Sequence, residues 1–273
     1  MNESQKVVNS PFANPFAGGP GWKLNLVFTS RYAKVNKIMD SSSDPERDVK
    51  IAKIVNNGIF MTAVQVMQTG AFSMSMDNLK KKMNLLSRGY FLVKHTIEHD
   101  NKVLPVYTVG PACSDHPDLQ SIVQVRNNFY KRYSLTNVLH ILSVNQFCVR
   151  LFKENYVKVN YKVIEPYAAE VEFINRKYGN PYDNRDKRHK VSIISLRNYD
   201  VEREEFVRQL SKATDKTIVI AHDLSSIKEN AVRLMDERFS ITTDDMLFRE
   251  KLTDAFYVPV DGRLVPQKIT IFE

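Results

Sequence analysis

One stretch of the chain changes its hydrophobic period within a few residues, and this change limits the folds open to it. In LKKKMNLLSRGYFLVKHTIEHDNKVLPVYTVG, residues 79–110, apolar side chains recur at helical spacing up to Leu86 and then at nearly every second position. Gly89 marks the end of the helix. Strands at 90–99 and 103–109 are expected around the turn HDNK. The stretch therefore predicts a helix followed directly by a β-hairpin.

Two further helices are predicted before this one. The segment SSSDPERDVKIAKIVNNG has a capping residue, a proline in the first turn and Asn-Gly at its end. TAVQVMQTG gives a second, shorter helix capped by Thr62, and the third helix begins at Ser75. Three helices and a hairpin in this order are typical of a winged helix, in which the third helix enters the major groove of DNA and the hairpin lies along the backbone.

Basic and amide side chains gather on the third helix and the hairpin. The candidate DNA-contacting residues there are Asn78, Lys80, Lys81, Lys82, Asn84, Arg88, Lys94 and Lys102. Lysine and arginine neutralise phosphates, and asparagine can reach base edges. A solvated basic face is the alternative, but a formal net charge of +8 favours a polyanionic partner, so double-stranded DNA is expected here. His95 and His99 on the hairpin are interpreted as phosphate contacts or plain surface residues.

Strands and helices alternate in the second half of the chain. Helices are expected in DLQSIVQVRNNFYKRYS and SLTNVLHILSVNQFCVRLFKEN, and strands in NYKVIEP, AEVEFINR and KVSIISLRN. The helix VEREEFVRQLSKA, the strand TIVIAHD, the helix SSIKENAVRLMDER, the strand FSITTDD and a terminal hairpin follow. This order predicts an α/β domain with a mixed sheet, so the fold class is α+β or α/β overall. Residues 24–39 are left open between strand and helix.

Four parts are expected along the chain. They are an arm rich in proline, glycine and phenylalanine at 1–22, a winged helix-turn-helix domain at 23–112, a helical connector at 113–156 and the α/β domain at 157–273. Phe12 and Phe16 on the arm are candidates for docking a protein partner, with folding back onto the chain's own domain as the alternative. Cys113 and Cys148 have no CxxC neighbour and are interpreted as packing residues.

The long helix and two late strands carry a family resemblance. LHILSVNQF at 139–147, TIVIAHD and FSITTDD resemble segments of the replication-relaxation proteins of bacterial plasmids and phages. The resemblance would cover about residues 45–260. It implies a winged helix followed by a restriction-endonuclease-like domain. It also implies a role in replication initiation, or in assembling the relaxosome that relaxes and mobilises DNA.

An active nuclease of that fold needs acidic residues on two neighbouring strands, because carboxylates hold Mg²⁺. In the matching segment VSIISLRNYD, Ile194 and Leu196 occupy the places of the acids. We therefore expect no catalytic residue, metal ligand or cofactor, and a catalytically inactive domain. His222-Asp223 is interpreted as a helix start rather than a catalytic pair. A metal-dependent nuclease stays as an alternative, with the remaining acids Glu170, Glu172, Asp183 and Asp186.

A second nucleic-acid contact is predicted in the basic loop NRKYGNPYDNRDKRHK, which carries interleaved tyrosines. Its candidate residues are Arg185, Lys187 and Arg188, which together with the tyrosines could grip single-stranded DNA; a solvated hairpin loop is the alternative. The sequence is thus expected to encode a non-enzymatic DNA-binding protein, with a winged-helix transcriptional regulator as the alternative. A homo-oligomer is left open. A cytoplasmic protein without membrane attachment is expected, since no apolar run approaches about 20 residues.

Overall fold

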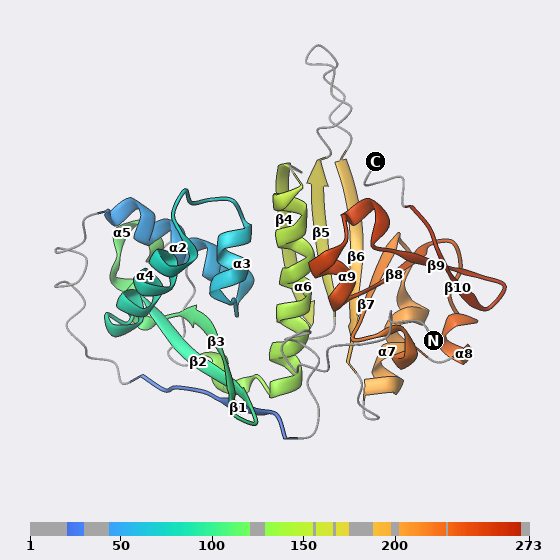
Figure 1. Ribbon diagram of the computed structural model, residues 1–273, viewed down its shortest axis with the longest axis horizontal. Helices are drawn as coiled ribbons and strands as arrows, with labels where there is room; N and C mark the ends of the chain where they lie inside the picture. Colours follow the sequence, from blue (N-terminus) through green and yellow to red (C-terminus); the bar gives the residue numbers. More distant parts are fainter. Residues whose placement is uncertain are drawn as a thin grey trace, which may run out of the picture.

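Two sheets lie on either side of one long helix in the computed structural model (Figure 1). The structure describes residues 21–29, 44–120, 129–154, 157–165, 168–174, 188–197, 202–227 and 229–268. The long helix is α6 (Leu135–Lys153), and most of its side chains are buried. The fold is a mixture of helices with a small antiparallel sheet and a larger mixed sheet. Among the described helices, none combines the length and apolar content needed to cross a membrane.

The N-terminal half has the predicted order of three helices and a hairpin. The elements are α2 (Pro45–Gly58), α3 (Ala63–Gln68), α4 (Met76–Arg88), β2 (Leu92–His99) and β3 (Lys102–Val109). The helices begin at polar caps: the Asp44 side chain accepts the Arg47 N–H, and Thr62 forms a capping box with Gln65. Ser75 likewise accepts a backbone N–H at the start of α4. Local capping chemistry therefore fixes where each helix starts.

Helix α4 ends at Gly89, as predicted, and the residue after it makes the turn into the hairpin. Gly89 caps α4 with φ near −91°, and the left-handed turn falls on Tyr90, with φ of 59°. Gly110, at the other end of the hairpin, packs against this turn, because a Cβ there would lie 2.0 Å from the Tyr90 carbonyl oxygen. The hairpin itself turns at Asp100, whose φ is 52°.

The small sheet has the order β1-β2-β3. Strand β1 (Lys23–Asn25) pairs antiparallel with β2, so the segment left open in the sequence begins as a strand; residues 30–39 lie outside the described residues. The connection between α2 and α3 also joins the sheet, through a bridge between Met61 and Tyr107 of β3. The hairpin is therefore held on both edges.

The large sheet is mixed, as predicted. Its strands are β4 (Val157–Glu165), β5 (Ala168–Ile174), β6 (Arg188–Leu196), β7 (Thr217–Ala221), β8 (Phe239–Thr243), β9 (Tyr257–Val260) and β10 (Arg263–Pro266), and they lie in sequential order. β4, β5 and β6 form an antiparallel meander, β6, β7 and β8 run parallel, and β9 and β10 form the terminal antiparallel hairpin.

Helices cover both faces of this sheet. On one face, Phe147 and Cys148 of α6 pack against Val171 of β5 and its neighbours. On the other face, α7 (Glu202–Lys212) and the short α8 (Glu229–Val232) cover β6, β7 and β8. The prediction for the region of α8 was too long, because 3₁₀ and turn residues take up much of 225–238. The buried Cys113 and Cys148 confirm their packing role.

The remaining elements are short. They are α5 (Pro117–Gln120), α9 (Asp244–Arg249) and 3₁₀ turns at Pro111–Asp115, Phe129–Arg132, Leu224–Ser226 and Leu252–Asp254. The helix predicted over 118–134 is thus a single α-turn and a 3₁₀ turn at its two ends, and residues 121–128 lie outside the described part.

Candidate nucleic-acid interface

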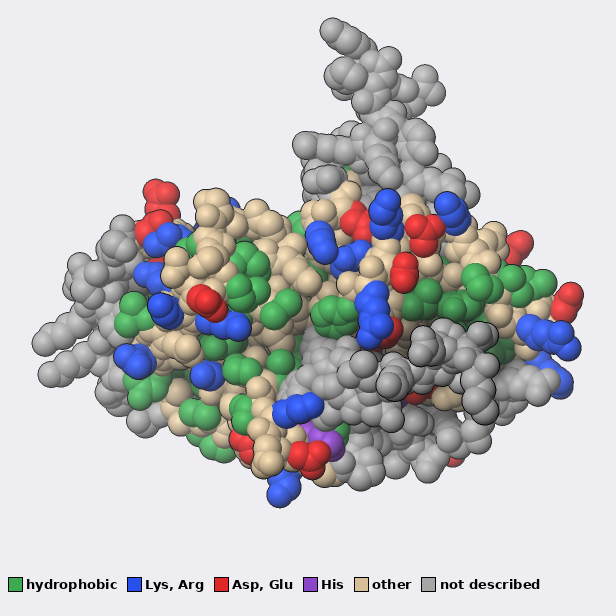
Figure 2. Space-filling view, in the orientation of Figure 1, with side chains coloured by type: hydrophobic (Ala, Val, Ile, Leu, Met, Phe, Trp, Pro, Cys, Tyr) green, Lys and Arg blue, Asp and Glu red, His purple; other side chains and the backbone are tan. Residues whose placement is uncertain are grey.

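Helix α4 has one buried and one basic face. Leu79, Met83 and Leu86 are fully buried against the other N-terminal helices. Lys81 and Arg88, seven residues apart, point the opposite way and are exposed. The exposed side chains of Asn78 and Lys80 flank them. Figure 2 shows Lys and Arg side chains gathered over the part of the molecule where α2 and α4 lie.

Lys82 does not belong to this surface. Its Nζ lies 2.8 Å from the carboxylate of Asp48 on α2, and the two side chains are only 12% and 1% exposed. One residue along a helix turns the side chain by about 100°, which carries Lys82 from the outer face of α4 toward α2. Lys82 therefore joins two helices of the fold, contrary to its predicted role as a phosphate contact.

Asn84 and Lys94 are also used within the fold. Lys94 Nζ donates to Asn84 Oδ1 over 3.1 Å, and the Tyr107 hydroxyl donates to the same oxygen over 3.3 Å. Burial raises the pKa of Tyr107, so its hydroxyl stays protonated and remains a donor. These bonds connect α4 to both hairpin strands. They fix the angle of the hairpin relative to α4. Because the Asn84 Oδ1 already accepts two hydrogen bonds, Asn84 is less able to contact a base edge than predicted.

The hairpin contributes a basic residue at its tip and a histidine in its core. Lys102 is exposed beside the turn, next to the His99–Asp100 pair, whose Nδ1 and Oδ2 atoms lie 3.2 Å apart. His95, in contrast, is fully buried, which corrects its interpretation as a surface residue. Burial lowers the pKa of His95 to about 4, so the ring is neutral near pH 7.

The other predicted contacts are only partly described. Arg188 is exposed at the start of β6. Arg185 and Lys187 of the basic loop lie outside the described residues, as do Phe12 and Phe16 of the arm. The structure therefore brings Arg188 to an accessible strand end, and the grouping of the remaining loop residues stays a prediction.

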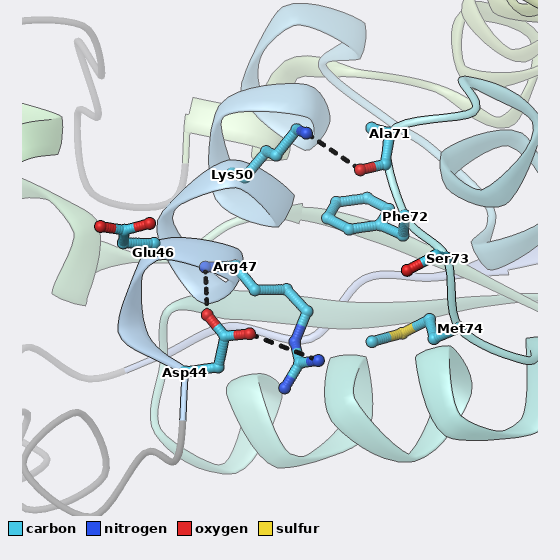
Figure 3. A pocket seen from close by; sticks show the side chains of 8 residues that line it. All are labelled: Asp44, Glu46, Arg47, Lys50, Ala71, Phe72, Ser73 and Met74. Atoms are coloured by element: carbon cyan, nitrogen blue, oxygen red, sulfur yellow. Dashed lines mark hydrogen bonds and ion pairs between the residues drawn. The ribbon is translucent and has the colours of Figure 1, made fainter.

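Two basic residues near α4 were missed in the sequence: Arg47 and Lys50 of α2. They line a polar pocket opposite the α3–α4 connection (Figure 3). The Lys50 Nζ donates to the Ala71 carbonyl over 2.9 Å and lies 5.5 Å from the Phe72 ring centroid. The Arg47 guanidinium pairs with Asp44 over 3.4 Å. Their spacing of three residues on the first turns of α2 is the signal that could have found them.

The positions of nuclease acids are filled by core residues. Ile194 and Leu196 of β6 are buried with Phe206 and Leu210 of α7. Glu170 pairs across the sheet with Lys190 at 3.5 Å. Among the described residues, no three His, Cys, Asp or Glu side chains are grouped so that they could hold a metal ion. Asp183 and Asp186 lie outside those residues.

Caps and an ion pair occupy the carboxyl ends of the parallel strands. Arg197, directly after β6, makes a two-bond contact with Asp244 at 2.6 and 3.1 Å, and both side chains are fully buried. After β7, Asp223 caps the following 3₁₀ turn as a helix start should, although the His222 Nε2 also lies 3.2 Å from its carboxylate. These polar groups are therefore paired with one another or cap a turn within the fold.

No protein-family model matches the sequence, and no curated protein and no solved structure is significantly similar to it.

Proposed function

We propose that this chain is a non-enzymatic DNA-binding protein that docks α4 on duplex DNA. The observation that carries the proposal is the exposed face of α4, which presents Lys80, Lys81 and Arg88 beside Asn78, opposite a fully buried stripe. A hairpin follows this helix directly and carries Lys102 at its tip. Together with the helix order, this supports a winged helix whose third helix enters the major groove.

The polar ties behind α4 support the same function. Asp48 holds one side of the helix through Lys82, and Lys94 and Tyr107 hold the other side through Asn84. A helix fixed in this way presents its cations in a constant arrangement, so less conformational entropy is lost on binding. Lys82 is therefore a supporting residue in this proposal.

The C-terminal half is proposed to be an inactive, restriction-endonuclease-like scaffold. Its order α6-β4-β5-β6-α7-β7, with β5 antiparallel to its neighbours and β6 parallel to β7, supports this assignment. The apolar Ile194 and Leu196 support the loss of metal chemistry, since neither side chain can bind an ion. The resemblance to replication-relaxation proteins adds the proposed setting: replication initiation or relaxosome assembly on a plasmid or phage.

The proposal is tested by fluorescence anisotropy with a labelled random duplex across a salt series. The variant Lys80→Ala/Lys81→Ala/Arg88→Ala leaves Lys82 in place, because removing it would leave Asp48 buried without its cation. We expect affinity to fall by about one order of magnitude or more, and the slope of log K against log salt to decrease by about 2 to 3.

A matched variant controls for the loss of net charge. Lys153→Ala/Lys212→Ala/Lys251→Ala also removes three exposed cations, but from the opposite half of the chain. It should bind nearly as the parent does. Equal affinities for the parent and the α4 variant would contradict the proposal, as would binding insensitive to salt.

A transcriptional regulator is a second candidate, favoured by a groove where the two halves meet. The groove has a volume of about 270 Å³ and is lined by residues that include Ile54 of α2, Thr69, Val149 of α6 and Tyr161 of β4. A small effector bound there would contact both halves and the connection that leads into α4. Footprinting on an origin and on a promoter separates the two functions.

A further inference from the structure

We propose a second nucleic-acid surface, centred on Phe28, that binds single-stranded DNA by stacking its bases. The surface consists of Val27 and Phe28 from the N-terminal segment and Lys131, Arg132 and Tyr133 from the turn before α6. It is distinct from the exposed face of α4 and from the basic loop at 175–190. The inference rests on the proposed function, because it names a further part of the same nucleic-acid ligand.

Phe28 is held in place by a buried anchor. The Val27 N–H donates to His95 Nδ1 over 3.0 Å, and the His95 ring lies 4.5 Å from the buried Tyr130 ring, centroid to centroid. The Phe28 ring is stacked on Tyr130, with centroids 6.3 Å apart and planes 14° apart. Two segments a hundred residues apart in sequence are thus joined across His95.

The outer part of this stack is exposed to solvent. Phe28 is 56% exposed and its neighbour Val27 is 47% exposed. Exposed apolar side chains that adjoin one another often mark a binding site. An aromatic ring held in this way loses little conformational freedom when a flat ligand stacks on it.

Cations lie beside the exposed Phe28 ring and the half-buried Tyr133 ring. Lys131 Nζ lies 4.9 Å from the Phe28 centroid, and the Arg132 guanidinium lies 5.2 Å from the Tyr133 centroid. The described residues 26–29 and 129–137, which form this surface, contain these two cations but no aspartate or glutamate. The surface is therefore basic and aromatic at once.

Single-stranded DNA fits this chemistry better than a duplex. Its phosphates complement Lys131 and Arg132, and its unpaired bases can stack on Phe28 and Tyr133. In a duplex the base faces are already stacked on one another and unavailable to a side chain. An acidic protein segment would complement the charge as well, and the experiment below separates it from DNA.

The surface lies across the hairpin from α4. Lys94 of β2 contacts α4, whereas Val93, His95 and Ile97 alternate with it and face the cluster that contains Tyr130 and the first turns of α6. A single strand that leaves a duplex bound at α4 would need to pass only the hairpin to reach Phe28. The two surfaces together suit a junction between duplex and single-stranded DNA.

Trp22 provides a local readout, since it is the one tryptophan of the chain and lies in the same segment, 5.1 Å from the His99 ring. The probes are a thymidine oligonucleotide of about 12 nucleotides and an abasic oligonucleotide of equal length. Because each stacked base adds to the affinity of the thymidine strand, we expect that strand to bind about tenfold more tightly than the abasic strand. We also expect Trp22 fluorescence to change on binding.

Two variants test the role of the Phe28 ring, and a third is their control. Phe28→Ala should abolish the preference for the thymidine strand, whereas Phe28→Tyr should keep it. Leu234→Ala is the matched control, because Leu234 is 58% exposed in the other half of the chain. Far-UV circular dichroism and melting confirm that each variant is folded.

The outcomes separate this inference from the proposed function. A parent protein that binds duplex but shows no preference for thymidine over abasic DNA overturns the second surface and leaves α4 as the duplex contact. The reverse result, thymidine preference without duplex binding, supports the second surface and overturns the docking of α4. Binding of polyglutamate that is lost in Phe28→Ala would assign the surface to an acidic protein partner and overturn the inference.

Discussion

His95 shows how one buried side chain makes stability depend on pH. Its Nδ1 accepts the Val27 N–H, so a neutral ring carries its proton on Nε2, which lies 3.0 Å from the Thr108 hydroxyl. Protonation of Nδ1 would break the first of these bonds and place a charge among apolar residues. The lowered pKa, about 4, reflects this cost.

The consequence is a loss of stability in acid. Below pH 6.5 the unfolded chain takes up a proton on His95, whereas the folded chain does so only near pH 4. The free energy of unfolding should therefore fall as pH drops from about 7 to 4, by on the order of 3 kcal/mol from this group. Urea unfolding at several pH values should show a shallower dependence for His95→Gln. Parallel curves for parent and variant would contradict the assignment.

For single residues, the sequence predicted which side chains share one face of a helix or strand better than it predicted what each side chain contacts. The alternation of Val93, His95 and Ile97 places the three side chains on one face of the strand. The apolar Val93 and Ile97, on either side of His95, are what indicate that this face is buried. Lys82 is similar: it sits one position before the buried Met83, but its partner Asp48 is distant in sequence. A charge run shows where cations occur, and the helical period is needed to show which of them reach solvent.

Helix α6 is the element on which most of the fold depends. The Asn145 Nδ2 donates to the carbonyls of Gly58 and Phe60 at 2.8 and 2.7 Å, and Gln65 Nε2 donates back to the Leu142 carbonyl at 2.7 Å. These bonds are buried, and those from Asn145 supply donors to two carbonyls of the connection between α2 and α3, which pairs with β3 only at Met61. The side chains of Asn145 and Gln65 thus hold α2 and α3, which lead into α4, against α6.

Replacing that side chain should be costly. Asn145→Ala removes the side-chain donor to the buried Phe60 carbonyl and one of two donors to the Gly58 carbonyl, which keeps the Phe60 N–H, so we expect the free energy of unfolding to fall by about 2 kcal/mol. Asn137→Ala is the control on the same helix, because Asn137 uses its backbone N–H, not its side chain, in the capping bond to Ser134. It should change stability by less than about 0.5 kcal/mol. If chemical denaturation gave equal losses of unfolding free energy for the two variants, the side-chain amide of Asn145 would contribute no more to stability than that of Asn137.

Element types were largely predictable because they depend on local chemistry. Caps such as Thr62 and Ser75 and the switch of period after Arg88 are encoded within a few residues. The region of α8 was wrong in length, since its apolar spacing fits a helix while the chain uses 3₁₀ and turn residues there. The junction at Tyr90 was also unexpected, because its left-handed backbone depends on the approach of Gly110 from the far end of the hairpin.

At the scale of the whole molecule, α6 links the cores of both halves. Leu139 and Leu142 pack with the hairpin, Val149 joins the core of the first three helices, and Phe147 and Cys148 pack on the large sheet. The sequence predicted a long apolar helix but not its neighbours, because a helix buried on nearly every side has no polar face to indicate its orientation. Which elements pack against each side of α6 is therefore set by the tertiary fold and cannot be predicted from the sequence of α6 alone.

This arrangement predicts that the two halves unfold together. Val219 lies on β7, in the middle of the large sheet, and is fully buried, whereas Trp22 directly precedes β1 of the small sheet, and the two sheets lie on either side of α6 (Figure 1). Val219→Ala should reduce the free energy of unfolding by about 2 kcal/mol through the cavity it leaves. If α6 couples the cores, urea unfolding followed by Trp22 fluorescence should shift to lower midpoint by the same amount as unfolding followed by circular dichroism. A Trp22 transition that stays at its original midpoint would mean that the N-terminal half folds independently, with α6 serving as a structural neighbour rather than a shared core.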